Sequence, residues 1–139
     1  MCIRDRYPPP PKLVCNVSNC AVGMHAGTVR GVVEVPTQSE PELRAAVAKG
    51  PVAVSVWAGA LQFYHKGVLE GECMPGQYGN HAMLVVGFGD DAGVPYWKIK
   101  NSYGTDFGED GYLRIRRNDS KCGKTGGIGV LAAPVYPQI

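Results

Sequence analysis

Long hydrophobic runs are missing from this sequence. The longest apolar stretch, Val52–Leu61, is much shorter than the roughly 18 residues that a membrane-spanning helix requires. Residues 1–20 hold no apolar segment of the kind that forms a secretory signal. A membrane is therefore not an expected partner of this chain.

A surplus of charge of one sign is missing too. The 14 basic and 12 acidic residues give a formal net charge of +2. The basic group Arg114, Arg116 and Arg117 alternates with Leu113 and Ile115, which is typical of a strand with one solvated face. Nucleic acid is therefore not an expected partner. Histidines and cysteines at ligand spacing are too few to predict a metal site.

The N-terminal end is expected to be set apart from the rest. Residues 1–6 resemble the conceptual translation of a sequencing adapter, so they are expected to be an artefact rather than part of the fold. Residues 7–27 begin with a proline run, which prevents ladder hydrogen bonds, and are expected to form an extended linker at a domain interface. Residues 28–139 are expected to form one barrel-like domain.

The remaining sequence predicts an α+β fold that is mostly β. Alternating or β-branched stretches predict about six strands, including residues 28–35, 51–57, 111–117 and 129–135. With short connections, these strands predict an antiparallel sheet or a partly open barrel. One short helix is expected near residues 40–49, because Ser39 is a preferred N-cap residue and Gly50-Pro51 would end the helix.

A central hairpin is expected to bring two polar side chains together. Apolar strands flank the turn-rich segment Gly89–Gly93, with His81 at the outer end of the first strand and Asn101 at the outer end of the second. If the turn is centred between Asp91 and Ala92, His81 faces about residue 102. An imidazole and a carboxamide should therefore meet.

Several motifs surround this hairpin in a fixed order. They are Asn80-His81-Ala82, Gly87-Phe88-Gly89, Trp97-Lys98-Ile99-Lys100-Asn101-Ser102-Tyr103-Gly104 and Phe107-Gly108-Glu109-Asp110-Gly111-Tyr112. Together they resemble the C-terminal half of the papain-like cysteine proteases, over residues 7–139. The resemblance implies the right-hand, barrel-like C-terminal domain of a thiol-dependent endopeptidase. Such an enzyme acts on polypeptide substrates, needs no cofactor, and works in a secreted, lysosome-type or vacuole-type compartment.

The resemblance also assigns roles. His81 is expected to act as acid and base toward a cysteine thiol and the leaving amine, while Asn101 orients its imidazole. Tyr103 stands where the family usually has a tryptophan that shields this pair, so a weaker shield is expected. The pocket for the second residue before the scissile bond is expected to be lined by Ser55, Gly79 and Asn80, with Leu131 or Ala132 near its floor. This uncharged lining predicts a preference for bulky apolar side chains over arginine.

The nucleophile is the main departure from the family pattern. The family's cysteine lies about 130–150 residues before the histidine, a span that would begin before residue 1. Cys2 falls in the adapter-like segment, and neither Cys15 nor Cys20 stands in the context Cys-Gly-Ser-Cys-Trp. The chain is therefore expected to be inactive alone and to need the missing N-terminal half of the same protease. The alternative is a non-catalytic papain-like paralogue that acts as a binding protein.

Cysteines and glycosylation sequons favour an oxidising compartment. By the resemblance, Cys73 and Cys122 form a disulfide that closes a loop of about 50 residues and contributes about 3–4 kcal/mol. Cys15 either pairs with a cysteine of the absent half or bridges to Cys20. The sequons are Asn16-Val17-Ser18 and Asn118-Asp119-Ser120.

Overall fold

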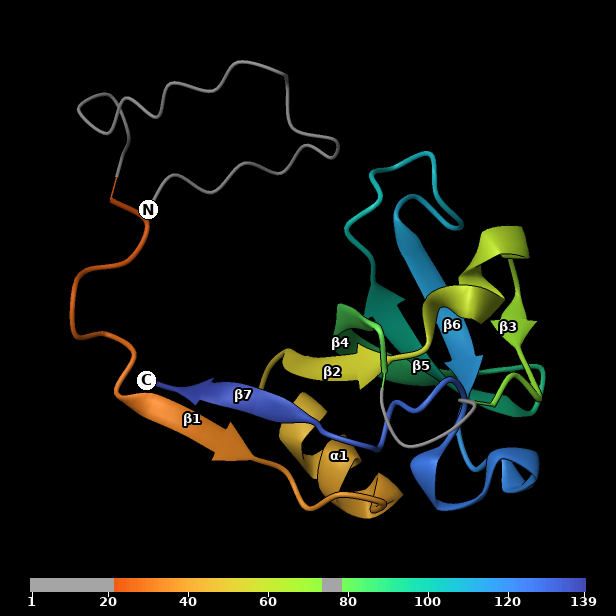
Figure 1. Cartoon of the computed structure of the whole chain (residues 1–139), viewed down its shortest axis with the longest axis horizontal. Helices are drawn as coiled ribbons and strands as arrows, with labels where there is room; N and C mark the ends of the chain where they lie inside the picture. Colours follow the sequence, from red (N-terminus) through yellow and green to blue (C-terminus); the bar gives the residue numbers. More distant parts are fainter. Residues whose placement is uncertain (1–21, 74–78) are drawn as a thin grey trace.

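The computed structural model describes residues 22–73 and 79–139. Its strands are β1 (Gly31–Glu34), β2 (Val52–Val56), β3 (Val68–Leu69), β4 (His81–Asp91), β5 (Val94–Lys100), β6 (Tyr112–Arg116) and β7 (Val135–Gln138). Its helices are α1 (Glu40–Val47) and the 3₁₀-helices η2 (Ala58–Phe63) and η3 (Ser120–Thr125). The strands form one open sheet in the order β1-β7-β2-β4-β5-β6-β3 (Figure 1). The predicted α+β, mostly β fold is confirmed.

One edge of the sheet departs from the antiparallel prediction. Strand β3 pairs with β6 in parallel, with Val68 opposite Arg114 and Leu69 opposite Ile115, whereas the other strand pairs are antiparallel. The sheet is therefore mixed. Two residues are too few to show the period-two alternation of a strand, so the sequence held no signal for β3.

The predicted helix near residues 40–49 is confirmed as α1, which ends at Val47. The Ser39 hydroxyl accepts a hydrogen bond from the backbone N–H of Glu42 at 3.5 Å, as expected of an N-cap residue. Leu43 and Val47 are buried, and α1 packs against β2 and β4 (Figure 1). The helix therefore supports the strand that begins at His81.

The core is built from side chains on one face of each central strand, together with side chains of α1 and of the segment between η3 and β7. Its fully buried members include Leu43, Val52, Val56, Val85, Trp97, Ile99, Leu113, Ile115, Ile128 and Val130. Burying each such side chain contributes roughly 1.5–3 kcal/mol. Trp97 and Ile99 alternate with exposed lysines along β5, and Asn101 continues the buried face at 7% exposure. The strand parity thus carries a carboxamide to the apolar side of the sheet.

The last strand lies later than predicted. Residues 129–135 were expected to form it, but β7 begins at Val135 and pairs with β1 along its length. The preceding segment turns through positive φ angles at Gly126, Ile128 and Gly129. Ile128, Val130 and Leu131 in this segment are buried, so the apolar pattern reflects packing into the core rather than a strand.

The central hairpin is confirmed, with a shifted register. The predicted centre would place Val85 opposite Lys98, whereas the structure pairs Val85 with Ile99 and Gly87 with Lys98. Val86 is the extra residue of a β-bulge. The turn itself contains Ala92 and Gly93, both with positive φ, which is the geometry of a two-residue type I′ hairpin.

Candidate active site

The open ends of the hairpin place His81 beside Asn101. Nε2 of His81 lies 2.9 Å from Oδ1 of Asn101. The backbone N–H of Ser102 also donates to this oxygen, at 2.8 Å. Because a backbone amide can only donate, the oxygen rather than Nδ2 has to occupy this position, and Nε2 therefore carries a proton. The other ring nitrogen, Nδ1, is then the one that can accept a proton.

Neighbouring segments fix both residues. His81 pairs with Val56 of β2, and the backbone N–H of Asn101 donates to the carbonyl of Gly111 at 2.9 Å. Nδ2 of Asn101 is buried and has no hydrogen-bond partner among the residues described, so Oδ1 alone holds this side chain in place. The predicted meeting of His81 and Asn101 is thus observed, about where the hairpin placed it.

Aromatic rings extend from the imidazole. Tyr103 stacks on His81 with ring centroids 5.1 Å apart and planes 28° apart. Phe107 meets Tyr103 edge-on with ring centroids 5.5 Å apart, and the ring centroid of Tyr64 lies 5.9 Å from that of Phe107. Tyr103 is 40% exposed, so it covers one side of the imidazole while remaining accessible itself.

Gly108 is required in the loop that carries these rings. Its φ is +54°, and a Cβ there would lie 2.5 Å from the carbonyl oxygen of Tyr112 and 2.8 Å from the ring of Tyr64. Gly104, in the same loop, has φ +90° but nothing within 4 Å of a Cβ. Substituting the two glycines separately therefore distinguishes the cost of backbone strain, which both positions share, from the cost of steric crowding, which only Gly108 has.

We expect Gly108→Ala to destabilise the chain more than Gly104→Ala does. The Gly104 change costs about 1 kcal/mol for a left-handed backbone, whereas the Gly108 change adds roughly 1–3 kcal/mol of overpacking. Urea unfolding followed by tryptophan fluorescence measures both. Equal losses for the two variants would contradict the crowding argument.

Glu109 and Arg114 form a partly buried ion pair. Nε and Nη2 of Arg114 donate to the Glu109 carboxylate at 2.9 and 2.8 Å, and the backbone N–H of Gly67 donates to it at 2.9 Å. The hydrogen bonds from Arg114 hold the pKa of Glu109 below its ordinary value. The Tyr64 hydroxyl donates to the carbonyl of Gly67 at 2.8 Å, and burial raises the pKa of Tyr64.

This network was not predicted from the sequence. Arg114 was interpreted as part of a solvated strand face, but its guanidinium contacts both Glu109 and Asp91. The ion pair joins the loop after Asn101 to strand β6. The strand alternation at Arg114 indicated only which face its side chain would take.

We expect Glu109→Gln to destabilise the chain in a pH-dependent way. A carboxylate whose pKa is lowered by folding contributes stability above its unfolded pKa, about 4.5, and loses that contribution as pH falls through the folded value. Urea unfolding should show a loss of roughly 1.5–3 kcal/mol at pH 7 that shrinks below the unfolded pKa. Glu70→Gln is the matched control, because the Arg116–Glu70 pair is more exposed and contributes about 0–1 kcal/mol. A loss independent of pH would contradict this account.

The predicted pocket residues separate into two groups. Gly79 lies against β2, where a Cβ would clash with the Ser55 hydroxyl and lie 2.6 Å from the backbone nitrogen of Val56. Oδ1 of Asn80 accepts the backbone N–H of Ala58 at 2.8 Å, which caps the start of η2. Leu131, in contrast, is 3% exposed and belongs to the hydrophobic core. The structure thus brings Ser55, Gly79 and Asn80 to the strand end that carries His81.

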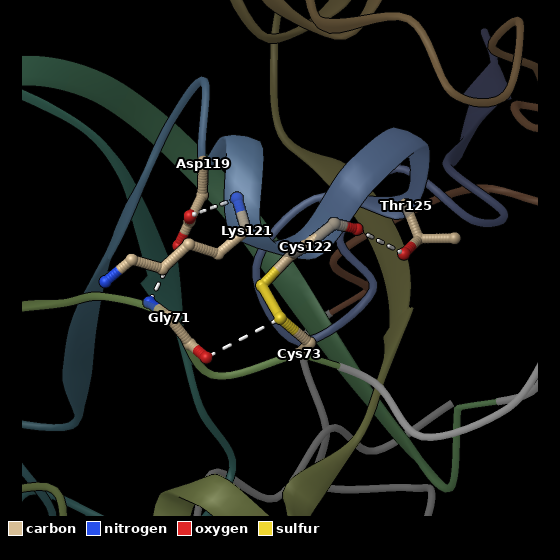
Figure 2. The surroundings of a disulfide bond; sticks show 6 residues. All are labelled: Gly71, Cys73, Asp119, Lys121, Cys122 and Thr125. Carbon is tan, nitrogen blue, oxygen red and sulfur yellow. Dashed lines mark hydrogen bonds between the residues drawn. A yellow bond between two sulfur atoms is a disulfide. The ribbon is translucent and has the colours of Figure 1, made fainter.

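Cys73 and Cys122 form a disulfide, as predicted, with Cα atoms 4.9 Å apart (Figure 2). It joins the segment after β3 to η3. Because both sulfurs are bonded, neither can serve as the nucleophile. Cys2, Cys15 and Cys20 lie outside the described residues, as do residues 1–6 and most of the predicted linker 7–27.

Residues 22–73 and 79–139 contain neither a metal-binding cluster nor a membrane-spanning helix. No group of three or more histidine, cysteine, aspartate or glutamate side chains in these ranges could hold a metal ion. No helix in them is long and apolar enough to cross a membrane.

Comparison with known sequences identifies cysteine proteinases among the relatives of this chain. The chain is 41% identical over 112 residues to the cysteine proteinase COT44 of Brassica napus, and the aligned region covers 79% of this chain and 33% of that protein. It is 41% identical over 115 residues to vignain of Phaseolus vulgaris, and this aligned region covers 81% of this chain and 31% of that protein. The chain therefore spans about a third of the length of these relatives.

Solved structures of proteases also match the fold of this chain. The bromelain protease of Ananas comosus, in complex with the E64 inhibitor, matches with a TM-score of 0.73 and 38% identity over 80% of this chain and 51% of that one. Digestive procathepsin L 3 of Tenebrio molitor matches with a TM-score of 0.71 and 38% identity, over 80% of this chain and 36% of that one. A sequence profile of the papain family cysteine proteases covers residues 4–129. The chain belongs to the papain family of cysteine proteases.

Proposed function

We propose that this chain supplies the histidine and the asparagine of a papain-type endopeptidase. The observation that supports the proposal most directly is the hydrogen bond between His81 and Asn101. It directs the Nε2 proton to the amide oxygen and leaves Nδ1 to exchange a proton with a thiol. The nucleophilic cysteine comes from a segment outside the described residues, which we propose is the N-terminal half of the same protease.

In the proposed reaction, Nδ1 of His81 takes the proton from the cysteine thiol, which forms a thiolate and an imidazolium. The thiolate attacks the carbonyl carbon of the scissile peptide bond. His81 then gives its proton to the leaving amine, the C–N bond breaks, and a thioester remains. A water molecule, deprotonated by the same imidazole, hydrolyses the thioester and restores the thiol.

Asn101 and Tyr103 are proposed to keep the imidazole in its reactive orientation. Asn101 is buried, so water competes little for its hydrogen bond to Nε2. The ring of Tyr103 stacked on His81 limits rotation of the imidazole and access of water from one side. An imidazolium beneath an aromatic face is also stabilised by the ring quadrupole.

The substrate is proposed to be a polypeptide with a bulky apolar residue in the second position before the scissile bond. Ser55, Gly79 and Asn80 are uncharged, and they lie at the same end of the sheet as His81. No carboxylate among them would pair with arginine. A peptide-library profile of the complete protease should therefore favour leucine, valine or phenylalanine over arginine there, and the reverse preference would contradict the assignment.

The proposed compartment is secreted or of the lysosomal or vacuolar type. The Cys73–Cys122 disulfide is of a kind that persists in oxidising environments and is rare in the cytosol. The bond joins the segment after β3 to η3, and its proposed role is to stabilise the domain rather than to take part in the reaction.

The test is to extend the coding sequence upstream of codon 7 and to express the complete protein. We expect an upstream cysteine in the family's Cys-Gly-Ser-Cys-Trp context, and hydrolysis of peptide substrates that a thiol reagent blocks. Purified residues 1–139 should show no hydrolysis. A serine or glycine at the nucleophile position, or thiol-sensitive activity of the 139-residue chain alone, would overturn the proposal.

A further inference from the structure

The sequon Asn118-Asp119-Ser120 lies where the turn after β6 enters η3, with Asp119 as the N-cap and Ser120 as the first residue of η3. Asn118 and Ser120 are exposed, whereas Asp119 between them is 7% exposed. The acceptor amide and the hydroxyl that defines a sequon thus both face solvent. A surface turn is the setting in which this sequence pattern acts as an acceptor of an N-linked glycan.

The middle residue of the sequon is held inward by its own hydrogen bonds. The Asp119 carboxylate accepts the backbone N–H of Gly71 at 2.7 Å and that of Lys121 at 3.1 Å (Figure 2). Cys122, which forms the disulfide with Cys73, is the next residue after Lys121. The carboxylate is therefore occupied, and its charge is directed into the protein rather than toward the amide of Asn118.

The backbone at Asn118 leaves its side chain available. Its φ is +54°, a left-handed conformation that asparagine tolerates better than most residues. Its backbone N–H donates to Oε1 of Glu40 at 2.8 Å, which fixes the turn against the start of α1. Within the part of the chain that the structure describes, the side-chain amide of Asn118 makes no hydrogen bond.

The sequon lies at the end of the sheet opposite the candidate active site. The backbone N–H of Arg117 donates to the carbonyl of Pro95 at 2.8 Å, near the start of β5, whereas Asn101 follows the end of β5. At about 3.3 Å per residue, the strand separates the two ends by on the order of 20 Å. A glycan on Asn118 would therefore leave His81 and Asn101 accessible.

We infer that Asn118 carries an N-linked glycan, an inference that rests on the proposed secretory compartment. An oligosaccharide is transferred from a lipid-diphosphate donor to Nδ2 of Asn118. The bond between the sugar's anomeric carbon and the diphosphate oxygen breaks, a carbon–nitrogen bond forms, and the amide loses one proton as the lipid diphosphate leaves. A transferase of the secretory pathway catalyses the step.

The experiment expresses the full chain behind a secretion leader in eukaryotic cells, in an Asn16→Gln background that leaves one sequon. We expect a product whose mass falls after treatment with peptide N-glycosidase. Asn118→Gln and Ser120→Ala should abolish this shift, and Ser120→Thr should retain it. The peptide N-glycosidase should remove the glycan from the folded chain without denaturant, because the turn is exposed.

Alkylation of Cys73 and Cys122 distinguishes failure of the glycosylation site from failure of the proposed compartment. If Cys73 and Cys122 resist alkylation, as a disulfide does, and no glycan is present, the glycosylation site is wrong while the disulfide that supports the proposed compartment stands. If both cysteines are alkylated although the secretory pathway is oxidising, and no glycan is present, the disulfide that supports the proposed compartment does not form, and the inference fails with it. A mass shift that persists in the Asn118→Gln variant would also overturn the assignment.

Discussion

Replacing His81 by alanine is expected to lower kcat/KM of the complete protease by about 10²–10⁴-fold, the range attributed to general acid–base catalysis. Without the imidazole, the thiol has no base within hydrogen-bond distance to accept its proton, and the leaving amine has no proton donor. The loss should appear mainly in kcat, because His81 acts on the reacting atoms rather than on substrate affinity.

His65→Ala is the matched control for that experiment. His65 is exposed and follows η2, so its removal should leave kcat/KM unchanged. A second readout is the rate at which a thiol reagent alkylates the nucleophile, which should fall in His81→Ala because the thiolate fraction falls. A His81→Ala variant that keeps both its activity and its alkylation rate would contradict the assignment of His81 as the base.

Removal of the disulfide is expected to have the largest effect on stability. In Cys73→Ala/Cys122→Ala, the free energy of unfolding should fall by about 3–4 kcal/mol, because the unfolded chain regains the entropy of a loop whose ends are 49 residues apart. Urea unfolding of the two proteins measures the difference. Adding a reductant to the wild-type chain should reproduce the loss, and adding it to the double variant should have no further effect.

Thr125→Ala is the control for local packing near the bond. The Thr125 hydroxyl donates to the carbonyl of Cys122 at 3.2 Å, and losing one such hydrogen bond costs about 0.5–1.5 kcal/mol. If the double cysteine variant loses no more than Thr125→Ala does, the cross-link does not restrain the unfolded chain, and the entropic argument fails.

The candidate site could be predicted because its two described residues are local in sequence. His81 and Asn101 occupy the two ends of a single hairpin, so strand alternation and a turn signal were enough to bring them together. The register was off by one residue near the site, because the turn is centred one residue later than predicted and the bulge at Val86 offsets half of the resulting two-residue shift. Such a bulge leaves no mark in a hydrophobic pattern, because an inserted residue between two apolar neighbours reads as continued strand.

Features that depend on distant segments could not be predicted. Glu109 meets Gly67 across 42 residues of sequence, and neither residue type indicates the other. Gly79 is required only because the backbone of β2 runs against it at Val56. Residues 129–135 look like a strand because they are apolar, but their burial comes from turns folded against the core. Each case is decided by tertiary contact rather than by local preference.

The bulge at Val86 also bears on how the protein can be engineered. Strand β2 pairs with β4 only from His81 to Val85, so beyond the bulge β4 pairs with β5 alone. Because β6 pairs with β5 from Tyr96 onward, the pairs Asp90–Pro95 and Asp91–Val94 form a two-stranded extension next to the turn. A peptide tag or binding loop inserted between Ala92 and Gly93 would lengthen this extension at its tip. Because each doubling of loop length costs only about 0.6 kcal/mol, the hairpin offers an insertion point whose cargo leaves the register at His81 unaltered.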